Sequence, residues 1–542
     1  MKNLLRALAL LVFVGAAQAA PSSPPPKLVL QITVDQLRGD LLPRYRGRFG
    51  KGGFNLLMDR GLNYANAHYE TANTVTCAGH AVLATGADVA QHGIAGNNWF
   101  ERDTGKEVYC VDDDRYPPVG EPGKKGLSPA KLTSSTIGDE IVIASGHRGR
   151  AFAIAGKDRS SIVPGGHLGK SFWMSDVTGG VATSKYYYDT LPDWVTAWNE
   201  RKQFTTYRQG GWNLMHPLNT YVNAQSSANP YAHVKAKMTR GFPHTLTDLS
   251  DPDLVRALRF TPFLDELTAD FARELITKEK LGSNGVTDYL AISFSATDYV
   301  GHSFGPNSVE SEDNLLYLDA TLAKLFAFVD KTIGLRNTII VLCADHGADD
   351  VPEERKAEGY DAERIGGQKF HARLNELLKD RFNGADGLVA SVVPPNVYLD
   401  RAKIAAAHLD AAVVEAALAD ALRSEPGIAF AFTRSDLLAG RIGHTALSDR
   451  VQRAFHPTRS GDVVVIQAQF WYFDEAPDYY ATMHGSPYSY DTYVPILLLA
   501  PGLKAQTVRT PTAPAQIAPT IAALLGIRPP SGCACDPPLP GL

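Results

Sequence analysis

Residues 27–34 read KLVLQITV and lead directly into Asp35. Apolar and β-branched residues fill this stretch almost without interruption, which is typical of a strand buried on both faces of a parallel sheet. Three later stretches have the same character, namely RAFAIA (150–155), YLAISFS (289–295) and TIIVLC (338–343). Helical patterns separate these stretches, so the sequence predicts an α/β fold with a central, mostly parallel sheet flanked by helices.

Two long segments interrupt the alternation of strands and helices. Residues 172–244 are rich in aromatic, Asn, Gly and Ser residues, and residues 348–473 contain one helical pattern (409–422) and two strand patterns. We interpret both segments as insertions over the core, the first as a lid. The chain of 542 residues then divides into a targeting segment (1–19) and one large α/β unit (20–542).

The N-terminus has the features of a cleaved secretory signal peptide. Lys2 and Arg6 precede an apolar run over residues 7–17, and Ala-Gln-Ala at 17–19 offers a cleavage site. We therefore expect a periplasmic or secreted protein. No later stretch is long and apolar enough to suggest a membrane anchor, and a net charge of −5 argues against nucleic acid as the main partner.

Five cysteines in an exported chain permit two disulfides. Cys343 lies in an apolar run, and Cys533 and Cys535 lie in a Pro/Gly-rich tail. Cys77 and Cys110 flank the region of Thr76, and we favour them as one pair.

Thr76 lies in the stretch TANTVTCAGHAVLATG at 71–86, directly before Cys77. The first half predicts a loop and the second half a helix, so Thr76 is placed at a helix N-terminus, where an anion is stabilised. A threonine at this position is most often an N-cap. The acidic strand ends described next favour a chemical role instead.

Acidic residues follow three of the apolar strands: Asp35, Asp298 and Asp345. Ligands of doubly wound sheets bind at the carboxyl ends of the strands, so these carboxylates should share one site. Histidines accompany them, and the candidate metal ligands are Asp35, Asp298, His302, Asp345, His346 and His484. A mixed oxygen and nitrogen set suits Zn²⁺ or another borderline divalent ion, and six ligands suit two ions, as in displacement at phosphorus.

Seven short motifs carry a resemblance to a known family. They are VDQ (34–36), TVTCAGH (74–80), GNNW (96–99), GKDR (156–159), TDYVGH (297–302), ADHG (344–347) and HG (484–485). With these motifs the chain resembles the alkaline phosphatase superfamily, specifically the PafA-type phosphate-irrepressible alkaline phosphatases, which are related to the nucleotide pyrophosphatases/phosphodiesterases. The resemblance implies an alkaline-phosphatase-like core with inserted cap regions.

The resemblance also implies a role for each candidate residue. Thr76 would be the nucleophile, would form a phosphothreonine and would contact one metal ion. Asp298, His302 and His484 would hold one Zn²⁺, and Asp35, Asp345 and His346 would hold the other. Asn97, Lys157 and Arg159 would bind the non-bridging phosphoryl oxygens.

Lys157 and Arg159 bear on the substrate, because a phosphate monoester dianion needs more cationic compensation than a diester. The alternative is an ordinary solvated charge cluster. Two further alternatives stay open: Asn98 competes with Asn97, and His80 suits a structural hydrogen bond better than a metal. Cys77 has no identifiable base, and the Cys/Ser-x-Pro-x-Arg pattern of sulfatases is absent.

We therefore expect an exported, zinc-dependent alkaline phosphatase of broad specificity that acts as a monomer on small-molecule phosphate monoesters. One alternative is a phosphodiesterase or nucleotide pyrophosphatase on the same scaffold. Another is a non-catalytic exported metal-binding protein, which would explain the ligands but not Thr76 or the phosphate donors.

Overall fold

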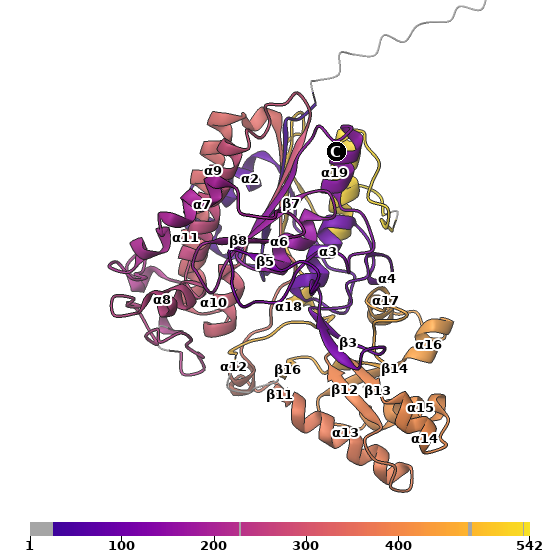
Figure 1. The fold of residues 1–542 in the computed structure, drawn as a ribbon. Coiled ribbons are helices and arrows are strands. Elements are labelled where there is room, and N and C mark those ends of the chain that lie inside the picture. The colour runs from indigo at the N-terminus through magenta and orange to yellow at the C-terminus, as the bar shows by residue number, and fades with distance from the viewer. Residues whose placement is uncertain (1–24, 227–228, 475–479, 535) are drawn as a thin grey trace, which may run out of the picture.

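The computed structural model describes residues 25–226, 229–474, 480–534 and 536–542, so the expected signal peptide at 1–19 lies outside the described residues. A ten-stranded sheet forms the centre of the fold (Figure 1). In spatial order its strands are β18 (Gln506–Val508), β2 (Leu62–Tyr64), β17 (Ile496–Leu499), β10 (Thr338–Cys343), β1 (Leu28–Val34), β9 (Asp288–Phe294), β6 (Ala151–Ala155), β7 (Lys170–Met174), β8 (Val181–Ser184) and β5 (Pro118–Val119).

The five middle strands, from β10 to β7, run parallel to one another, whereas β17 and β8 pair antiparallel on either side of them. Strand β1 lies at the centre, and Leu30 is in register with Ile340 of β10 and Leu290 of β9. Every residue of β1 is buried, as expected for a strand covered on both faces. The predicted fold class is confirmed.

Helices cover both faces of this sheet (Figure 1). On one side α9 packs on β6 and β9, and α11 packs on α9 and α2; on the other side α5 and α6 pack on the sheet beneath α3 and α19. Their bounds are α2 (Phe54–Arg60), α3 (Thr76–Thr85), α5 (Ile137–Ala144), α6 (Asp158–Gly165), α9 (Phe263–Lys278), α11 (Val309–Thr332) and α19 (Ile517–Leu525). Shorter helices are α1 (Leu41–Tyr45), α4 (Val89–His92) and α18 (Ser489–Thr492).

The first proposed insertion begins later than residue 172. Strands β7 and β8 belong to the central sheet, because their short apolar runs are fully buried there. The rest of the segment, which contains α7 (Asp193–Glu200), packs against α9 and α11, together with α8 (Asp251–Leu258), which follows it. Trp198 and Trp212 donate hydrogen bonds to Asp270 and Asp313 of those helices, at 3.0 and 2.7 Å. Its role as a lid stays a prediction.

The second segment forms a separate lobe beneath the sheet (Figure 1). Its strands β12, β13, β15 and β14 form a four-stranded sheet over a hydrophobic core of their own, and β11 pairs with β16. The predicted helix at 409–422 is present as α15, but the segment holds more than two strands, several of which are short and partly exposed. The elements are α12 (Pro352–Ala357), β11 (Glu363–Gly366), α13 (Gly367–Arg381), β12 (Val389–Val393), β13 (Asn396–Leu399), α14 (Arg401–Ala406), α15 (Ala411–Leu422), β14 (Ile428–Thr433), α16 (Arg434–Ala439), α17 (Ala446–Arg453), β15 (Val463–Gln467) and β16 (Trp471–Asp474).

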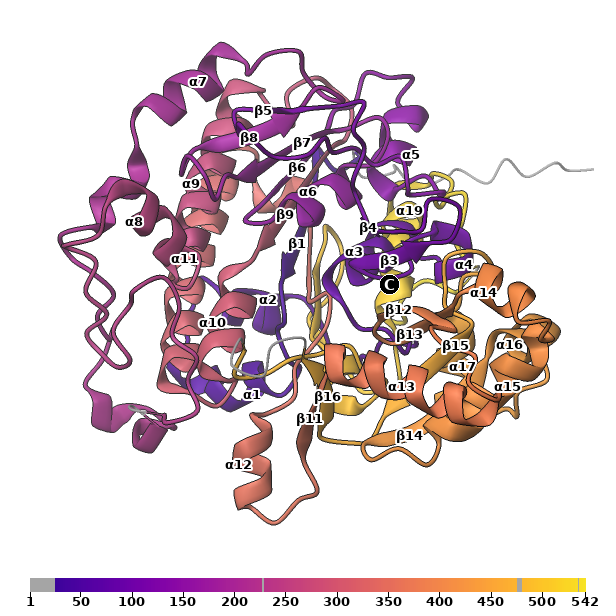
Figure 2. The same cartoon turned by 60° about the horizontal axis from the view of Figure 1, so that its bottom comes forward.

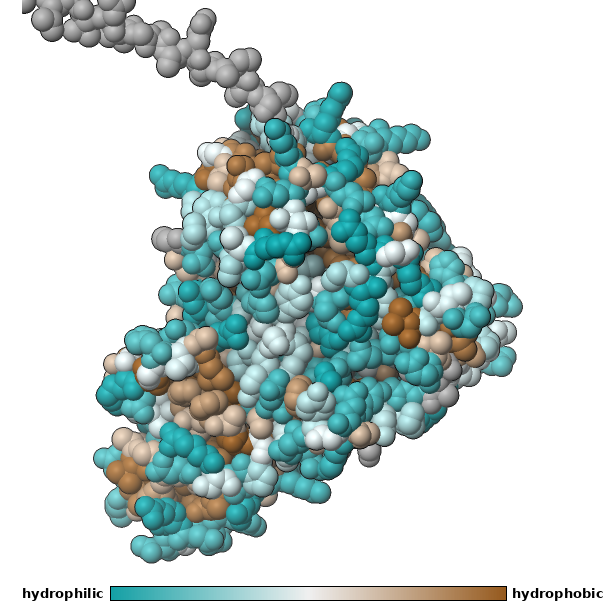
Figure 3. Space-filling view, turned by 180° about the vertical axis from the view of Figure 1, so that it is seen from behind, coloured by the Kyte–Doolittle hydropathy of each residue, from teal (hydrophilic) through white to brown (hydrophobic). Residues whose placement is uncertain are grey.

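Seen from behind, the molecule is mostly hydrophilic over the core, and apolar surface gathers on the second lobe (Figure 3). Exposed apolar side chains of this lobe include Val413, Phe430 and Leu438. Within the described ranges, every helix is too short or too polar to cross a membrane.

Candidate active site

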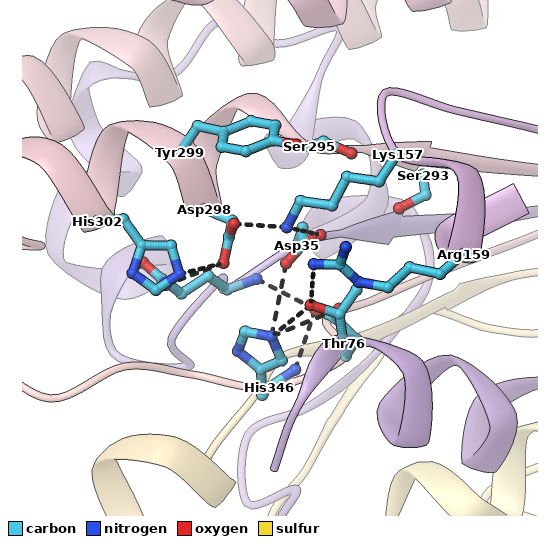
Figure 4. A network of polar contacts seen from close by, with 12 residues as sticks. Asp35, Thr76, Lys157, Arg159, Ser293, Ser295, Asp298, Tyr299, His302 and His346 are labelled. Carbon is cyan, nitrogen blue, oxygen red and sulfur yellow. Dashed lines mark hydrogen bonds and ion pairs between the residues drawn. The ribbon is translucent and has the colours of Figure 1, made fainter. Parts of the chain in front are cut away.

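The acidic strand ends meet at one edge of the central sheet. Asp35 follows β1, Asp345 follows β10, and Asp298 lies in the first turn of α10 (Ala296–Phe304), which begins just after β9. Lys157 follows the parallel strand β6. Parallel strands bring these residues to one place, and Figure 4 shows that the side chains of Asp35, Asp298 and Lys157 converge there.

Thr76 is the first residue of α3, and Val75 occupies the N-cap position. The Thr76 hydroxyl does not cap its own helix. Its Oγ1 lies 3.5 Å from Nε2 of His346 and 3.4 Å from Nη2 of Arg159 (Figure 4). The N-cap alternative is therefore wrong, and the hydroxyl faces the polar cluster.

The three predicted histidine ligands share one hydrogen-bonding arrangement. Nδ1 of each ring lies within hydrogen-bond distance of a backbone carbonyl, so Nδ1–H donates there and Nε2 carries the free lone pair. The carbonyls belong to Thr482 for His302 (2.7 Å), to Gly347 for His346 (2.9 Å) and to Thr74 for His484 (2.8 Å). Each Nε2 then faces a carboxylate of the site, which is the orientation that metal-binding histidines need.

The Nε2 atoms divide between two carboxylate positions. Those of His302 and His484 lie 3.1 and 3.7 Å from Oδ1 of Asp298. Nε2 of His346 lies 3.5 Å from Oδ1 of Asp35 and 3.6 Å from Oδ2 of Asp345. The two expected ligand triads therefore exist as neighbouring groups of side chains.

His346 and His80 complicate this division. The His346 ring also stacks on that of His484, with 3.6 Å between centroids, so His346 can equally be grouped with Asp298 and His484. His80 could replace it beside Asp35 and Asp345. The division above stays a prediction. Nε2 of His346 reaches both carboxylates, whereas Nε2 of His80 lies 3.7 Å from Oδ2 of Asp345 and 3.3 Å from the Ser293 hydroxyl.

Some of the buried carboxylate oxygens lack a hydrogen-bond donor. Oδ1 of Asp35 and Oδ2 of Asp345 have no hydrogen-bond partner among the described residues, and Oδ2 of Asp35 pairs with Nζ of Lys157. Burial, together with the neighbouring carboxylates, raises the pKa of Asp35 to about 8, and burial raises the pKa of Asp345 to about 7. Burial also acts to raise the pKa of Asp298, but His302 and Lys157 outweigh it and hold that pKa well below its ordinary value. Such orphaned oxygens suit bound cations.

Lys157 partly supplies this positive charge. Its Nζ lies 2.7 Å from Oδ2 of Asp35 and 2.5 Å from Oδ2 of Asp298 (Figure 4). Burial acts to lower the pKa of Lys157, but Asp298 and Asp35 outweigh it and raise that pKa. The side chain is buried, so it is not part of a solvated charge cluster, and it pairs with carboxylates instead of pointing at Thr76.

Asn97 is held against the start of α3. Its Oδ1 accepts a hydrogen bond from the Cys77 backbone N–H at 2.8 Å, and its backbone carbonyl accepts one from Cys110 N–H at 2.8 Å. A disulfide joins Cys77 to Cys110, which confirms the predicted pair. Asn98 begins the hairpin of β3 (Asn98–Glu101) and β4 (Lys106–Tyr109) and is exposed, so Asn97 is the asparagine next to Thr76.

The family assignment rests on matches that span most of the chain. The model of the type I phosphodiesterase / nucleotide pyrophosphatase family matches residues 29–487. The chain belongs to this family. Its relatives in the family include the alkaline phosphatase PhoV of Synechococcus elongatus, 35% identical over 94% of this chain and 91% of PhoV, and the alkaline phosphatase PafA of Elizabethkingia meningoseptica, 34% identical over 96% of this chain and 95% of PafA.

A crystal structure of wild-type PafA matches this chain with a TM-score of 0.88 and 33% identity. The match covers 95% of this chain and 99% of the PafA chain. The resemblance inferred from the motifs is therefore confirmed, together with the fold and the prediction of an enzyme of the phosphatase class. A non-catalytic metal-binding protein is not supported.

Several residues of the site were missed. Gln36 Nε2 donates to Oδ1 of Asp298 at 3.1 Å, and its own backbone N–H donates to Oδ1 of Asp345 at 3.1 Å. Asp265 of α9 accepts hydrogen bonds from backbone N–H groups at the start of α10, at 2.8 and 3.0 Å. The motif VDQ could have indicated Gln36, since it adjoins Asp35. Asp265 had no signal in the sequence, because it reaches the site from a distant helix.

Proposed function

We propose that this chain is an exported phosphatase that hydrolyses small phosphate monoesters of broad specificity through a phosphothreonine at Thr76. The position of the Thr76 hydroxyl carries the proposal. It lies at the start of α3, 3.4 Å from the Arg159 guanidinium and 3.5 Å from a histidine nitrogen. A phosphoryl group placed beside this hydroxyl would contact a cation on one side and the N-terminal N–H groups of a helix on the other.

Within this proposal each residue has a defined task. Oγ1 of Thr76 attacks phosphorus, and the alcohol leaves from the opposite side. Arg159 and the Nδ2 group of Asn97 donate to the non-bridging oxygens, and Lys157 adds a buried positive charge. Water then hydrolyses the phosphothreonine, which releases phosphate and restores the hydroxyl.

Two Zn²⁺ ions complete the proposed site. Asp298, His302 and His484 would hold one, and Asp35, Asp345 and His346 the other, with Thr76 beside the second. Bound ions of this kind favour the deprotonated threonine and stabilise the charge on the leaving oxygen. The orphaned carboxylate oxygens and the carbonyl-anchored histidines support this assignment.

Lys157 and Arg159 favour monoesters over diesters. Both cations lie at the same site, and a monoester dianion presents the extra negative charge that they compensate. One solved PafA structure, 33% identical to this chain, is a variant with a threonine, an asparagine, a lysine and an arginine replaced. The same four residue types surround the proposed phosphoryl position here.

The family description names phosphodiesterases, which keeps that activity as the second candidate. The double variant Lys157→Ala/Arg159→Ala separates the two. A monoesterase should lose monoester turnover by at least about 100-fold and change little on an aryl diester. Equal losses on both substrates, or a loss confined to the diester, would support the second candidate.

The remaining parts of the proposal concern the whole protein. Residues 1–19 would be a signal peptide that directs the chain to the periplasm or outside the cell, and residues 20–542 would form one catalytic domain that works as a monomer. A direct test of the chemistry is acid quenching during turnover, followed by mass spectrometry. Phosphate on Thr76 is expected, and phosphate on another residue would exclude the proposed nucleophile.

A further inference from the structure

A cavity of about 420 Å³ lies between the core and the second lobe and opens beside the active site. Figures 1 and 2 both place β3 next to β12 and β13, and the cavity lies in this region, where the second lobe approaches the loops around Thr76. Much of its wall is apolar, formed by Val75, Val393, Pro394, Pro395, Phe473 and Met483. Asn97 and His484 line it as well, so the cavity is continuous with the catalytic cluster.

The geometry of displacement at phosphorus indicates that the leaving group enters this cavity. Displacement at phosphorus places the attacking and leaving oxygens on opposite sides of the phosphorus atom. Thr76 attacks from the side of His346, which belongs to one proposed ligand group, whereas His302 and His484 belong to the other group, beside Asp298. The alcohol therefore departs toward His484, which belongs to the wall of this cavity.

A second cavity, of about 290 Å³, does not suit the leaving alcohol. Lys157 and Arg159 line it, so it borders the non-bridging oxygens and not the leaving oxygen. Most of its other residues are charged, and Arg259 pairs there with Asp176 at 3.0 Å. Although Leu127, Trp173 and Met174 also line it, burying an apolar alcohol there would remove charged side chains from water without a hydrogen-bond partner.

Contacts within the second lobe position part of the wall of the larger cavity. The Phe473 ring packs against Phe370 in the second lobe, with 5.5 Å between centroids. Pro394 and Pro395 form the connection between β12 and β13, and proline restricts the backbone of that connection. A cavity of about 150 Å³ lined by apolar residues is enough to hold benzene, so this one has room for a ring and its linker.

We propose that this cavity binds the apolar alcohol portion of the substrate, with Phe473 and Met483 as specificity-determining residues, so that phosphate monoesters of aryl or arylalkyl alcohols are preferred. The inference rests on the proposed function, because it needs a monoester at Thr76. It adds a substrate class that the catalytic cluster alone does not specify.

The test compares 2-phenylethyl phosphate with ethyl phosphate, whose alcohols are similarly acidic and differ mainly in the ring. Wild type should show a kcat/KM at least about tenfold higher for the phenylethyl ester, since one apolar group in a fitted pocket commonly gives that discrimination. Phe473→Ala and Met483→Ala should each remove most of this preference, because the loss in kcat/KM should be much larger for the phenylethyl ester than for ethyl phosphate. Remaining turnover of ethyl phosphate also shows that each variant is folded.

Phe430→Ala is the matched control, because Phe430 is an exposed aromatic side chain of the same lobe that does not line the cavity. It should retain the full preference. Equal kcat/KM for the two esters in wild type, or equal losses on both esters in the cavity variants, would overturn the inference while leaving the proposed function intact. Failure of wild type to hydrolyse either ester would overturn the proposed function and the inference together.

Discussion

The backbone N–H of Cys77 donates a 2.8 Å hydrogen bond to the side-chain oxygen of Asn97. Cys110 N–H donates to the backbone carbonyl of the same asparagine, and a disulfide joins the two cysteines. Asn97 is thus fixed at two points by a covalently closed unit that begins one residue after Thr76. These contacts orient the Asn97 side chain through Oδ1 and the backbone carbonyl. Nδ2 takes no part in them, so it can donate to a phosphoryl oxygen.

Removal of the disulfide should therefore lower kcat, because it would displace Asn97. The double variant Cys77→Ser/Cys110→Ser is expected to lose about tenfold in kcat on an aryl phosphate monoester, because a displaced donor binds the transition state less well. Asn97→Ala should lose more, about 100-fold, since the donor itself is absent. In the Asn97→Ala background the serine substitutions should have almost no further effect; additive losses would show that the disulfide acts through something other than Asn97.

Metal removal should abolish activity reversibly. Chelator treatment is expected to leave an inactive protein that Zn²⁺ reactivates, and the active enzyme should hold about two metal ions per chain. His484→Ala should retain only about one, because its Nε2 faces Asp298 at one of the two ligand positions. His444→Ala, which alters a highly exposed histidine, is the control and should retain both. A fully active chelated enzyme would contradict the two-metal site.

Close packing of α3 on the end of β10 should make Gly79 hard to replace. A methyl group at Gly79 would lie 2.2 Å from the Asp345 carbonyl oxygen, so Gly79→Ala must displace either α3 or the Asp345 loop. We expect a loss of about 1–3 kcal/mol in the free energy of unfolding, measured by urea denaturation. Gly47→Ala has open space around the new methyl group and should change stability by less than about 1 kcal/mol. Similar midpoints for the two variants would refute the tight contact.

His92 should make the protein sensitive to acid. Burial, aided by the nearby His456 and Arg459, lowers the pKa of His92 to about 3, from 6.5 in the unfolded chain. Its Nδ1 accepts a hydrogen bond from Ile94 N–H at 3.0 Å, which requires the neutral ring. Between pH 6.5 and about 3 the unfolded state binds more protons at this residue, so its contribution to stability is complete above pH 6.5 and falls as pH is lowered, by about 1.4 kcal/mol per pH unit.

The variant His92→Asn isolates that effect, because an asparagine oxygen can accept the same hydrogen bond and does not titrate. The difference in unfolding free energy between wild type and the variant, followed from pH 7.5 to about pH 4, should shift in favour of the variant as pH falls. A constant difference across this range would show that His92 titrates normally.

The central strands of the fold could be predicted from the sequence, and the edges could not. Strands β1, β6, β9 and β10 are continuous apolar runs, because helices bury both of their faces. The outer strands β5, β2 and β18 are only two or three residues long, so they leave no periodic pattern. The strands of the second lobe are four to six residues long, and several of them mix buried and exposed positions without regular alternation, so most of them were missed.

The site was predicted where its residues follow those strands. Asp35, Asp298 and Asp345 come together because parallel strands end at one edge, a relationship that spacing in the chain reveals. The pairing of Lys157 with two carboxylates could not be foreseen, since it depends on how much charge is buried in one place. The contact of Asp265 with the start of α10 likewise exists only after α9 has packed on the sheet.

The most direct test of the proposed chemistry is the rate of hydrolysis of an aryl phosphate monoester and of the matching diester by wild type, Thr76→Ala and Thr76→Ser, with Zn²⁺ supplied. We expect wild type to prefer the monoester, Thr76→Ala to lose this activity by at least about 1,000-fold, and Thr76→Ser to retain part of it, because a serine hydroxyl can still act as the nucleophile. Full monoester activity in Thr76→Ala would contradict the proposed mechanism, and a wild-type preference for the diester would contradict the proposed substrate.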